Sequence, residues 1–298
     1  MSFFTALILS LSAFAADAPS PTLPEGWPNL PVIDAHTHAY FSGQPETNSG
    51  IPETLPQYLK ELKEIGGVGA VGHGGKGVRE LEPELASLPL YQCFGVRDKV
   101  SAADVEKALK AKKARCVKIY LGYVHRFAAD KAYRPLYKLA EKYDVPVVFH
   151  TGDTYSTKGK LKYSDPLTID EVAVDFPKTT FVIAHLGNPW VESAAEVAYK
   201  NPNVYVEASA LLIGDFKGRQ EEVEAYLIKP LKWAYGYVAD SSKFMYGTDW
   251  PLVGMKDYFE AYKKAIPEKD WCKVFFQNAV KVFRMRELEK YRCPKETP

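Results

Sequence analysis

The stretch VIDAHTHAY, residues 32–40, places two histidines at the end of an apolar run that is typical of a β-strand. His36 and His38 are separated by one residue, so their side chains would point to the same side of a strand. Both imidazoles would then project together at the point where the chain leaves the sheet. Such a pair is either an ordinary polar strand end or half of a metal site, and the rest of the sequence has to supply the other ligands.

Beyond this stretch the sequence alternates between short apolar runs and amphipathic segments of helical period. The runs are continuously apolar, as is typical of parallel strands that are buried on both faces. We predict eight strands, each followed by a helix, at PVIDAH (31–36), GVGAVGHG (67–74), LYQCFGV (90–96), RCVKIYLG (115–122), VPVVFH (145–150), TTFVIAH (179–185), NVYVEAS (203–209) and KFMYGTD (243–249). This α/β pattern over about 250 residues predicts a single (β/α)8 TIM barrel, with a doubly wound open sheet as the alternative.

The N-terminal residues resemble an export signal. Residues 3–16 are almost all apolar or small, and Ala13-Phe14-Ala15 forms an A-x-A cleavage site. The run is too short to span a bilayer and predicts a signal peptide, although no Lys or Arg precedes it; the alternative is a buried N-terminal helix. We therefore expect a signal peptide at 1–15, a Pro-rich tether at 16–30, the barrel at 31–286 and a C-terminal tail at 287–298. The mature protein would be exported, as a periplasmic or secreted protein without stable membrane insertion.

Charge and cysteine content exclude several classes of protein. Lys plus Arg is 38 and Asp plus Glu is 37, so the net charge of +1 gives no reason to expect a nucleic-acid partner. The four cysteines, Cys93, Cys116, Cys272 and Cys293, form no C-x-x-C unit, so a thiolate zinc site is not predicted. Export would permit a disulfide, but Cys93 and Cys116 fall inside predicted strands and are expected to be small core residues.

All six histidines of the chain close or follow a predicted strand. They are His36, His38, His73, His125, His150 and His185. Asp249 ends the eighth strand, where a buried carboxylate needs a partner. The C-terminal ends of all barrel strands open at one mouth, so we expect these side chains to gather there. Imidazole and carboxylate ligands together suit Zn²⁺, with Mn²⁺ or Fe²⁺ as alternatives, so the set predicts a divalent metal site.

Five motifs resemble the amidohydrolase superfamily and are most similar to its amidohydrolase-related branch. They are ID-x-H-x-H (33–38), VVFHTG (147–152), VIAHLG (182–187), YGTDWP (246–251) and QNAVKVF (277–283). The resemblance covers about residues 30–285 and implies a metal-dependent hydrolase barrel. It places His36, His38, His150 and Asp249 on the metal, and His185 either on a second metal or in the role of catalytic base. Some relatives in this branch are decarboxylases, and a few need no metal.

Lys118, in RCVKIYLG, leaves the number of metal ions open. In two-metal relatives a lysine at this strand carries CO₂ as a carbamate that bridges both ions. If Lys118 does so, His150 and His185 would hold the second ion. The alternative is a lysine that pairs with Asp249 or with a substrate carboxylate, which would leave His185 free to act as acid or base.

We expect a metal-dependent hydrolase that acts on a C–N amide or an ester or lactone bond of a small organic substrate. Asp249 would be ligand and base, and His185 would hold a second ion or stabilise the oxyanion. The main alternative is a metal-dependent non-oxidative decarboxylase of a small aromatic carboxylic acid. A phosphodiesterase fits less well, because its relatives have a glutamate where this chain has Lys118, and no ligand is missing that would indicate a non-catalytic protein.

Several further residues are expected near the mouth, where aromatic rings and an arginine suit a small organic acid or ring. They are Tyr120, Tyr123, Arg126, Tyr155, Trp190 and Trp250. A homo-oligomer is possible on this sequence. Because metal ligands at the rim contribute little packing, we expect that exchanging both His36 and His38 for Ala removes the metal and leaves the fold intact.

Overall fold

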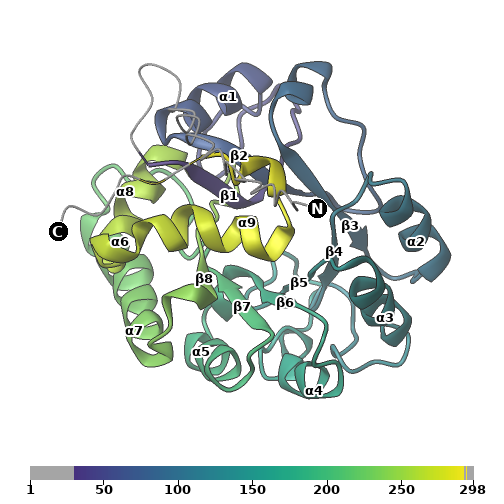
Figure 1. The fold of residues 1–298 in the computed structure, drawn as a ribbon. Helices are drawn as coiled ribbons and strands as arrows, with labels where there is room; N and C mark the ends of the chain where they lie inside the picture. The colour runs from purple at the N-terminus through teal and green to yellow at the C-terminus, as the bar shows by residue number, and fades with distance from the viewer. Residues whose placement is uncertain (1–29, 292, 294–298) are drawn as a thin grey trace, which may run out of the picture.

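The computed structural model describes residues 30–291 and 293 (Figure 1). The expected signal peptide, the tether up to residue 29 and the end of the C-terminal tail lie outside the described residues. None of the described helices is long and apolar enough to cross a lipid bilayer.

Eight parallel strands form the centre of the molecule, in chain order around one sheet. They are β1 (Val32–Thr37), β2 (Gly67–His73), β3 (Leu90–Val96), β4 (Cys116–Tyr120), β5 (Val147–His150), β6 (Phe181–Ile183), β7 (Val204–Glu207) and β8 (Phe244–Met245). The sheet closes where β1 meets the segment after β8: the Ala35 amide donates to the Tyr246 carbonyl at 2.9 Å, and the Asp249 amide donates to the His36 carbonyl at 2.7 Å. The predicted (β/α)8 barrel is confirmed.

Most helices surround the barrel and cover the outer face of its strands (Figure 1). They are α1 (Leu55–Glu64), α2 (Ala102–Lys110), α3 (Arg134–Tyr143), α4 (Thr168–Asp175), α5 (Val191–Lys200), α6 (Gln220–Val223), α7 (Lys229–Val238), α8 (Met255–Ala265) and α9 (Asn278–Phe283). Ser101 caps the N-terminus of α2, because its side chain accepts from the Asp104 amide. A π-helical turn at Glu224–Ile228 joins α6 to α7 without a break in the helical segment.

The expectation that a helix follows every strand is wrong between β2 and β3, at residues 77–88. Only a short 3₁₀ turn, Pro83–Ser87, forms there. Gly77 instead pairs with Gly95 of β3 through two backbone hydrogen bonds of 2.8 Å. The segment after β2 is therefore held against β3 at the barrel mouth, where an outer helix could not lie.

Two apolar cores stabilise the barrel, one inside it and one between the strands and the helices. Inward-facing residues such as Ile33, Ala35, Val148 and Met245 form the inner core. The final helical segment completes this core at one end of the barrel: Phe276, in the π-helical turn Lys273–Gln277, and Phe283, in α9, pack against the same residues. In Figure 1, α9 crosses the near end of the barrel, which is the end opposite the strand C-termini. The C-terminal mouth is thus the open end of the barrel.

The structure corrects the interpretation of the cysteines. Cys93 and Cys116 are both buried, but they lie opposite each other on β3 and β4 and form a disulfide. Cys272 and Cys293 form a second disulfide, which ties residue 293 to the start of the final helical segment. The described residues contain no free cysteine. The first pairing depends on strand register, which the spacing of cysteines in the sequence does not reveal.

Candidate active site

A pocket of about 430 Å³ opens at the C-terminal mouth of the barrel. All six residues that the sequence predicts as metal ligands or catalytic groups line it: His36, His38, Lys118, His150, His185 and Asp249. They come from β1 and the residue after it, the middle of β4, the end of β5, the turn after β6 and the segment after β8. The pocket therefore gathers residues that are up to 213 positions apart in the sequence into one concave site, as expected of an active site at this end of a barrel.

A register shift in β1 positions its two histidines. Ile33 and Ala35 point into the inner core, so regular alternation would turn His36 outward. The pairing of β1 with β2 is irregular between Asp34 and Thr37, and an irregularity of this kind re-aims side chains. His36 consequently faces the pocket, as does His38 two residues later.

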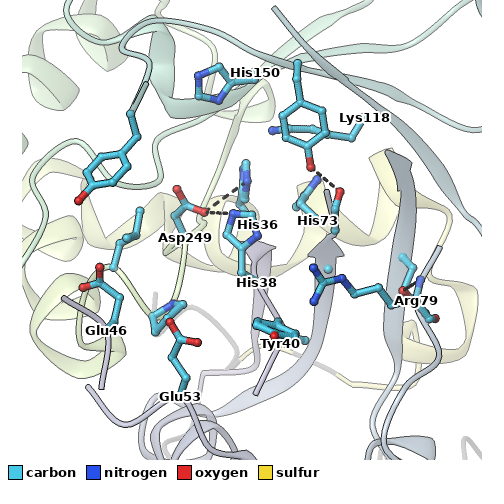
Figure 2. A pocket seen from close by; sticks show the side chains of 18 of the residues that line it. His36, His38, Tyr40, Glu46, Glu53, His73, Arg79, Lys118, His150 and Asp249 are labelled. Carbon is cyan, nitrogen blue, oxygen red and sulfur yellow. Dashed lines mark hydrogen bonds and ion pairs between the residues drawn. The ribbon is translucent and has the colours of Figure 1, made fainter. Parts of the chain in front are cut away.

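Three donor atoms converge in front of these strands. Figure 2 shows the His36 and His38 rings pointing toward the carboxylate of Asp249. Asp249 Oδ1 lies 2.8 Å from His38 Nε2 and 3.6 Å from His36 Nε2. These three donors lie within 4.8 Å of one another. Two donors bound to one ion at about 2.1 Å lie roughly 3–3.4 Å apart, so the spacing fits a single divalent cation.

The surroundings of His36 and Asp249 set the charge states of these two groups in the way that metal binding requires. Burial, assisted by nearby Lys118, holds the pKa of His36 well below its usual value, so the ring is neutral. Burial alone would raise the pKa of Asp249, but His38 and His36 hold it well below its usual value and the carboxylate stays ionised. A neutral His36 imidazole and an ionised Asp249 carboxylate are the protonation states in which these two side chains ligate a metal.

Glu207, at the end of β7, is a site residue that the sequence reasoning missed. It is fully buried, and its Oε1 accepts from His36 Nδ1 at 2.6 Å and from the His185 amide at 3.2 Å. Its Oε2 accepts from the Ser209 amide at 2.8 Å. Together with His36 and His185 it forms a second group of donors within 4.8 Å. The signal was present in NVYVEAS, where a carboxylate closes a buried strand as Asp249 does.

His185 and His150 form a hydrogen-bonded pair beside the donor group. His150 Nε2 lies 2.8 Å from the Asp153 carbonyl and must donate to it. His150 Nδ1 is then the acceptor for His185 Nε2, 3.1 Å away, which leaves His185 Nδ1 to accept from the Ser209 hydroxyl at 2.8 Å. The structure thus places His150 against His185 rather than within the group formed by His36, His38 and Asp249.

Asp249 and His185 share an unusual backbone conformation. Both adopt the left-handed region, with φ of 63° and 60°. Non-glycine residues rarely do so, and such conformations cluster at functional sites. Asp34 supports the segment that carries Asp249, because its carboxylate accepts from the Thr248 hydroxyl at 2.5 Å and from the Thr248 amide at 3.0 Å.

Lys118 projects from β4 into the barrel and is almost completely buried, with 1% of its surface exposed. Its ammonium nitrogen has no hydrogen-bond partner among the described residues. Figure 2 shows this nitrogen directed between His150 and His36. Burial lowers the pKa of Lys118 to about 8, although Glu207 and Asp249 partly oppose this shift. An appreciable fraction of the amine is therefore neutral near pH 7.

Not every residue expected near the mouth lines the pocket. Tyr120, Tyr123 and Tyr155 do, whereas Trp190, Trp250 and Arg126 do not. His73 lines the pocket and lies against the His36 ring, with centroids 4.0 Å apart. His125 lies elsewhere, stacked on Tyr163. Two arginines that the sequence reasoning did not single out, Arg79 and Arg97, line the pocket instead.

The sequence profile of the amidohydrolase family matches residues 91–285, which is well over half of the chain. The chain belongs to the amidohydrolase family. The match begins inside β3 and ends just after α9, so it includes His150, His185 and Asp249. A search of curated proteins finds no significant match.

Solved structures share the barrel of this amidohydrolase over almost their whole length. An uncharacterised TIM-barrel protein from Bordetella bronchiseptica is 19% identical, with a TM-score of 0.64 over 87% of this chain and 100% of that one. A probable 2-pyrone-4,6-dicarboxylic acid hydrolase from Acinetobacter baumannii is 15% identical, with a TM-score of 0.59 over 86% and 99%. A 5-carboxyvanillate decarboxylase from Novosphingobium aromaticivorans, complexed with manganese, is 13% identical, with a TM-score of 0.59 over 87% and 96%. At these identities the likeness concerns the fold.

Proposed function

We propose that this amidohydrolase is a metal-dependent hydrolase of a C–N amide, ester or lactone bond in a small organic molecule. One observation carries the proposal: His36, His38 and Asp249 line the pocket, and each offers one ligand atom within 4.8 Å of those of the other two. We propose Zn²⁺ as the ion, with Mn²⁺ or Fe²⁺ as alternatives for the same donors. When bound, a divalent ion there would polarise the scissile carbonyl and lower the pKa of water.

The remaining chemistry would be done by side chains of the chain itself. The ionised Asp249 would take a proton from the attacking water and pass it to the leaving group. His185, with Nε2 as a donor in its hydrogen-bonded state, would stabilise the negative charge that develops on the carbonyl oxygen. Glu207 would orient His36 by accepting its Nδ1 proton. The pocket walls would exclude bulk water and hold the substrate.

Elemental analysis and a substrate panel test this proposal. The purified protein should contain at least one equivalent of a divalent metal and should hydrolyse one or more members of a panel of lactones, esters and amides, with proton release followed in a pH-stat. Dialysis against a chelator should remove activity, and readdition of Zn²⁺, Mn²⁺ or Fe²⁺ should restore it. Full activity after complete metal removal would contradict the proposal.

A non-oxidative decarboxylase is the second candidate, because the manganese-bound 5-carboxyvanillate decarboxylase shares this barrel. In that case His185 or Asp249 would deliver a proton to the carbon that loses CO₂. The same panel, extended with aromatic carboxylic acids, separates the two reactions. Decarboxylation evolves CO₂ without water being consumed, whereas hydrolysis of an ester or lactone releases a new acid and no gas.

We also propose that the protein is exported and acts outside the cytoplasm. The A-x-A site at residues 13–15 supports this proposal, and so do the two disulfides, because such bonds persist in oxidising compartments. N-terminal sequencing of the native protein should begin near Ala16 or Asp17. An intact Met1 or Ser2 would argue against export.

A further inference from the structure

We propose that the pocket wall formed after β2 and β3 binds a carboxylate of the substrate through Arg97 and Arg79, which makes the substrates small, planar carboxylic acids. This inference rests on the proposed function and narrows its substrate class. The wall faces the same pocket as His36 and Asp249 but contributes none of their donor atoms.

Arg97 follows β3 directly and is held in place at one end of its guanidinium. Its Nε donates to the Gly75 carbonyl at 3.0 Å, and its charge lies 4.4 Å from the centre of the Tyr120 ring. The Tyr123 ring is 5.8 Å away. Within the described part of the chain, the two terminal nitrogens of Arg97 have no hydrogen-bond partner. These nitrogens form the fork that binds a carboxylate in bidentate fashion.

Arg79 approaches from the segment after β2. Its guanidinium lies 4.3 Å from the centre of the Tyr40 ring, and Figure 2 shows it reaching into the pocket between Tyr40 and His73. The side-chain amide of Gln92 holds the Arg79 backbone. Its Oε1 accepts from the Arg79 N–H at 3.1 Å, and its Nε2 donates to the Arg79 carbonyl at 2.9 Å. The backbone is thus anchored while the charged group remains available.

Neither guanidinium group forms an ion pair within the part of the chain that the structure describes. None of the ion pairs between described residues involves Arg79 or Arg97. Glu46 and Glu53 line the opposite side of the pocket in Figure 2. The Glu46 carboxylate already accepts from the Asn48 and Ser49 amides at 2.7 and 2.6 Å. Two cations in one pocket without an acidic partner are best satisfied by an anionic ligand.

The wall is preformed, because glycines let its backbone pack tightly. A Cβ at Gly95 would lie 2.6 Å from the Gly74 carbonyl and 2.8 Å from the Gly75 carbonyl, so only glycine fits there. The Gly74 carbonyl also accepts from the Tyr120 hydroxyl at 2.5 Å. The loop that carries Arg79 is therefore locked to β3 and β4. Rings from Tyr40, Tyr120 and Tyr123 flank the cations and would stack on a planar acid.

Binding of defined anions tests the inference on the metal-loaded full-length protein. The probes are isophthalate, its uncharged diamide, glutarate and inorganic phosphate, measured by isothermal titration calorimetry. We expect isophthalate to bind, with Arg97→Gln and Arg79→Gln each weakening it about 10- to 100-fold and leaving any binding of the diamide unchanged. Arg97→Lys should give an intermediate loss, because lysine keeps the charge without the fork. Glutarate should bind more weakly than isophthalate, because it has no ring to stack.

Arg134→Gln is the matched control. Arg134 also lies over an aromatic ring, 4.8 Å from the centre of Phe176, but it sits in α3 outside the pocket and pairs with Asp175. It should bind isophthalate like the unchanged protein. Metal content, measured on every variant, should stay constant and shows that the Arg97 and Arg79 variants remain folded.

Three results would overturn the inference. They are no binding of isophthalate or glutarate, equal affinity for isophthalate and its diamide, or an isophthalate affinity in both arginine variants that equals that of the unchanged protein. Phosphate binding as tight as isophthalate binding would also do so, because it would indicate a general anion site. Failure of the proposed function would give a different experimental result. In that case the protein would lack metal or hydrolyse nothing in the panel, while arginine-dependent binding of isophthalate would persist.

Discussion

Glu207 Oε1 accepts from Nδ1 of His36 at 2.6 Å, and both side chains are buried. The contact fixes the Nδ1 proton of His36 and directs the lone pair of Nε2 toward Asp249, 3.6 Å away. Glu207 also accepts from the amides of His185 and Ser209, and these contacts partly oppose the burial that raises the pKa of its carboxyl group. The carboxylate behind the histidine is therefore as much a part of the site as the donors in front of it.

Glu207→Gln should weaken metal binding about 10- to 100-fold, as loss of an orienting carboxylate behind a histidine ligand usually does. The change keeps the shape of the side chain but removes one acceptor and the charge. Competition with a chelating dye measures the metal affinity. Glu64→Gln, on the exposed face of α1, should have no effect. Equal affinities in both variants would show that Glu207 has no part in the metal site.

His38→Ala and His36→Ala should differ in their effect on stability. Both changes should remove the metal, but the His38 side chain is 39% exposed and that of His36 only 1%. The expectation that exchanging both residues leaves the fold intact assumed that rim ligands contribute little packing, and this assumption is wrong for the buried His36. Its removal leaves the Glu207 carboxylate buried without that partner, which should lower the free energy of unfolding by about 2–4 kcal/mol. Urea unfolding of the metal-free proteins, with His38→Ala near the unchanged protein, checks this difference.

Lys118→Met should stabilise the metal-free protein at neutral pH. Burial lowers the pKa of Lys118 to about 8 from the usual value of 10.5, so folding disfavours the protonated amine. The penalty is fully present below pH 8, where both states are protonated, and disappears as the pH rises toward 10.5, where the unfolded state also loses its proton. The shift corresponds to about 3 kcal/mol, so the variant should gain up to that amount at pH 7. Urea unfolding at pH 7 and pH 10 should show the gain shrinking; an equal gain at both would exclude the titration of Lys118 as its cause.

The number of metal ions per chain depends on Lys118. If the neutral amine takes up CO₂ to form a carbamate, releasing one proton, the protein should bind about two ions, with His150 and His185 on the second. Lys118→Ala should then lose one ion, and a short carboxylate added with metal should restore it. If Lys118→Ala keeps one tightly bound ion and near-normal rates, no bridge exists. His185→Asn should in that case abolish activity without changing the metal content.

The disulfide between Cys272 and Cys293 should contribute to stability although its second cysteine lies near the end of the described residues. It closes a loop of 21 residues, and removal of such a bond costs about 2–4 kcal/mol. The double change Cys272→Ala with Cys293→Ala should lower the free energy of unfolding by that amount and leave the metal affinity unchanged. Peptide mapping without reduction should detect both disulfides.

The order of strands and the outline of the site could be predicted from the sequence because both depend on local patterns. Apolar runs locate β1 to β8 in the sequence, and each histidine of the site closes or follows one of them. What could not be predicted depends on contacts across the barrel. The pairing of Cys93 with Cys116 requires the register of β3 and β4, and the position of Glu207 behind His36 requires closure of the sheet. The burial of His36 depends on a register shift in β1 that the residue types of this strand do not predict.

The closure of the barrel between β1 and the segment after β8 has a consequence for the order in which the protein matures. His36 and His38 come from the first strand and Asp249 from beyond the last, so the donor group spans the junction between the two ends of the fold. A growing chain has no such site until the segment after β8 has been synthesised. The ion would therefore bind late, after the strands have assembled. Its identity would depend on the cations present in the compartment in which folding finishes.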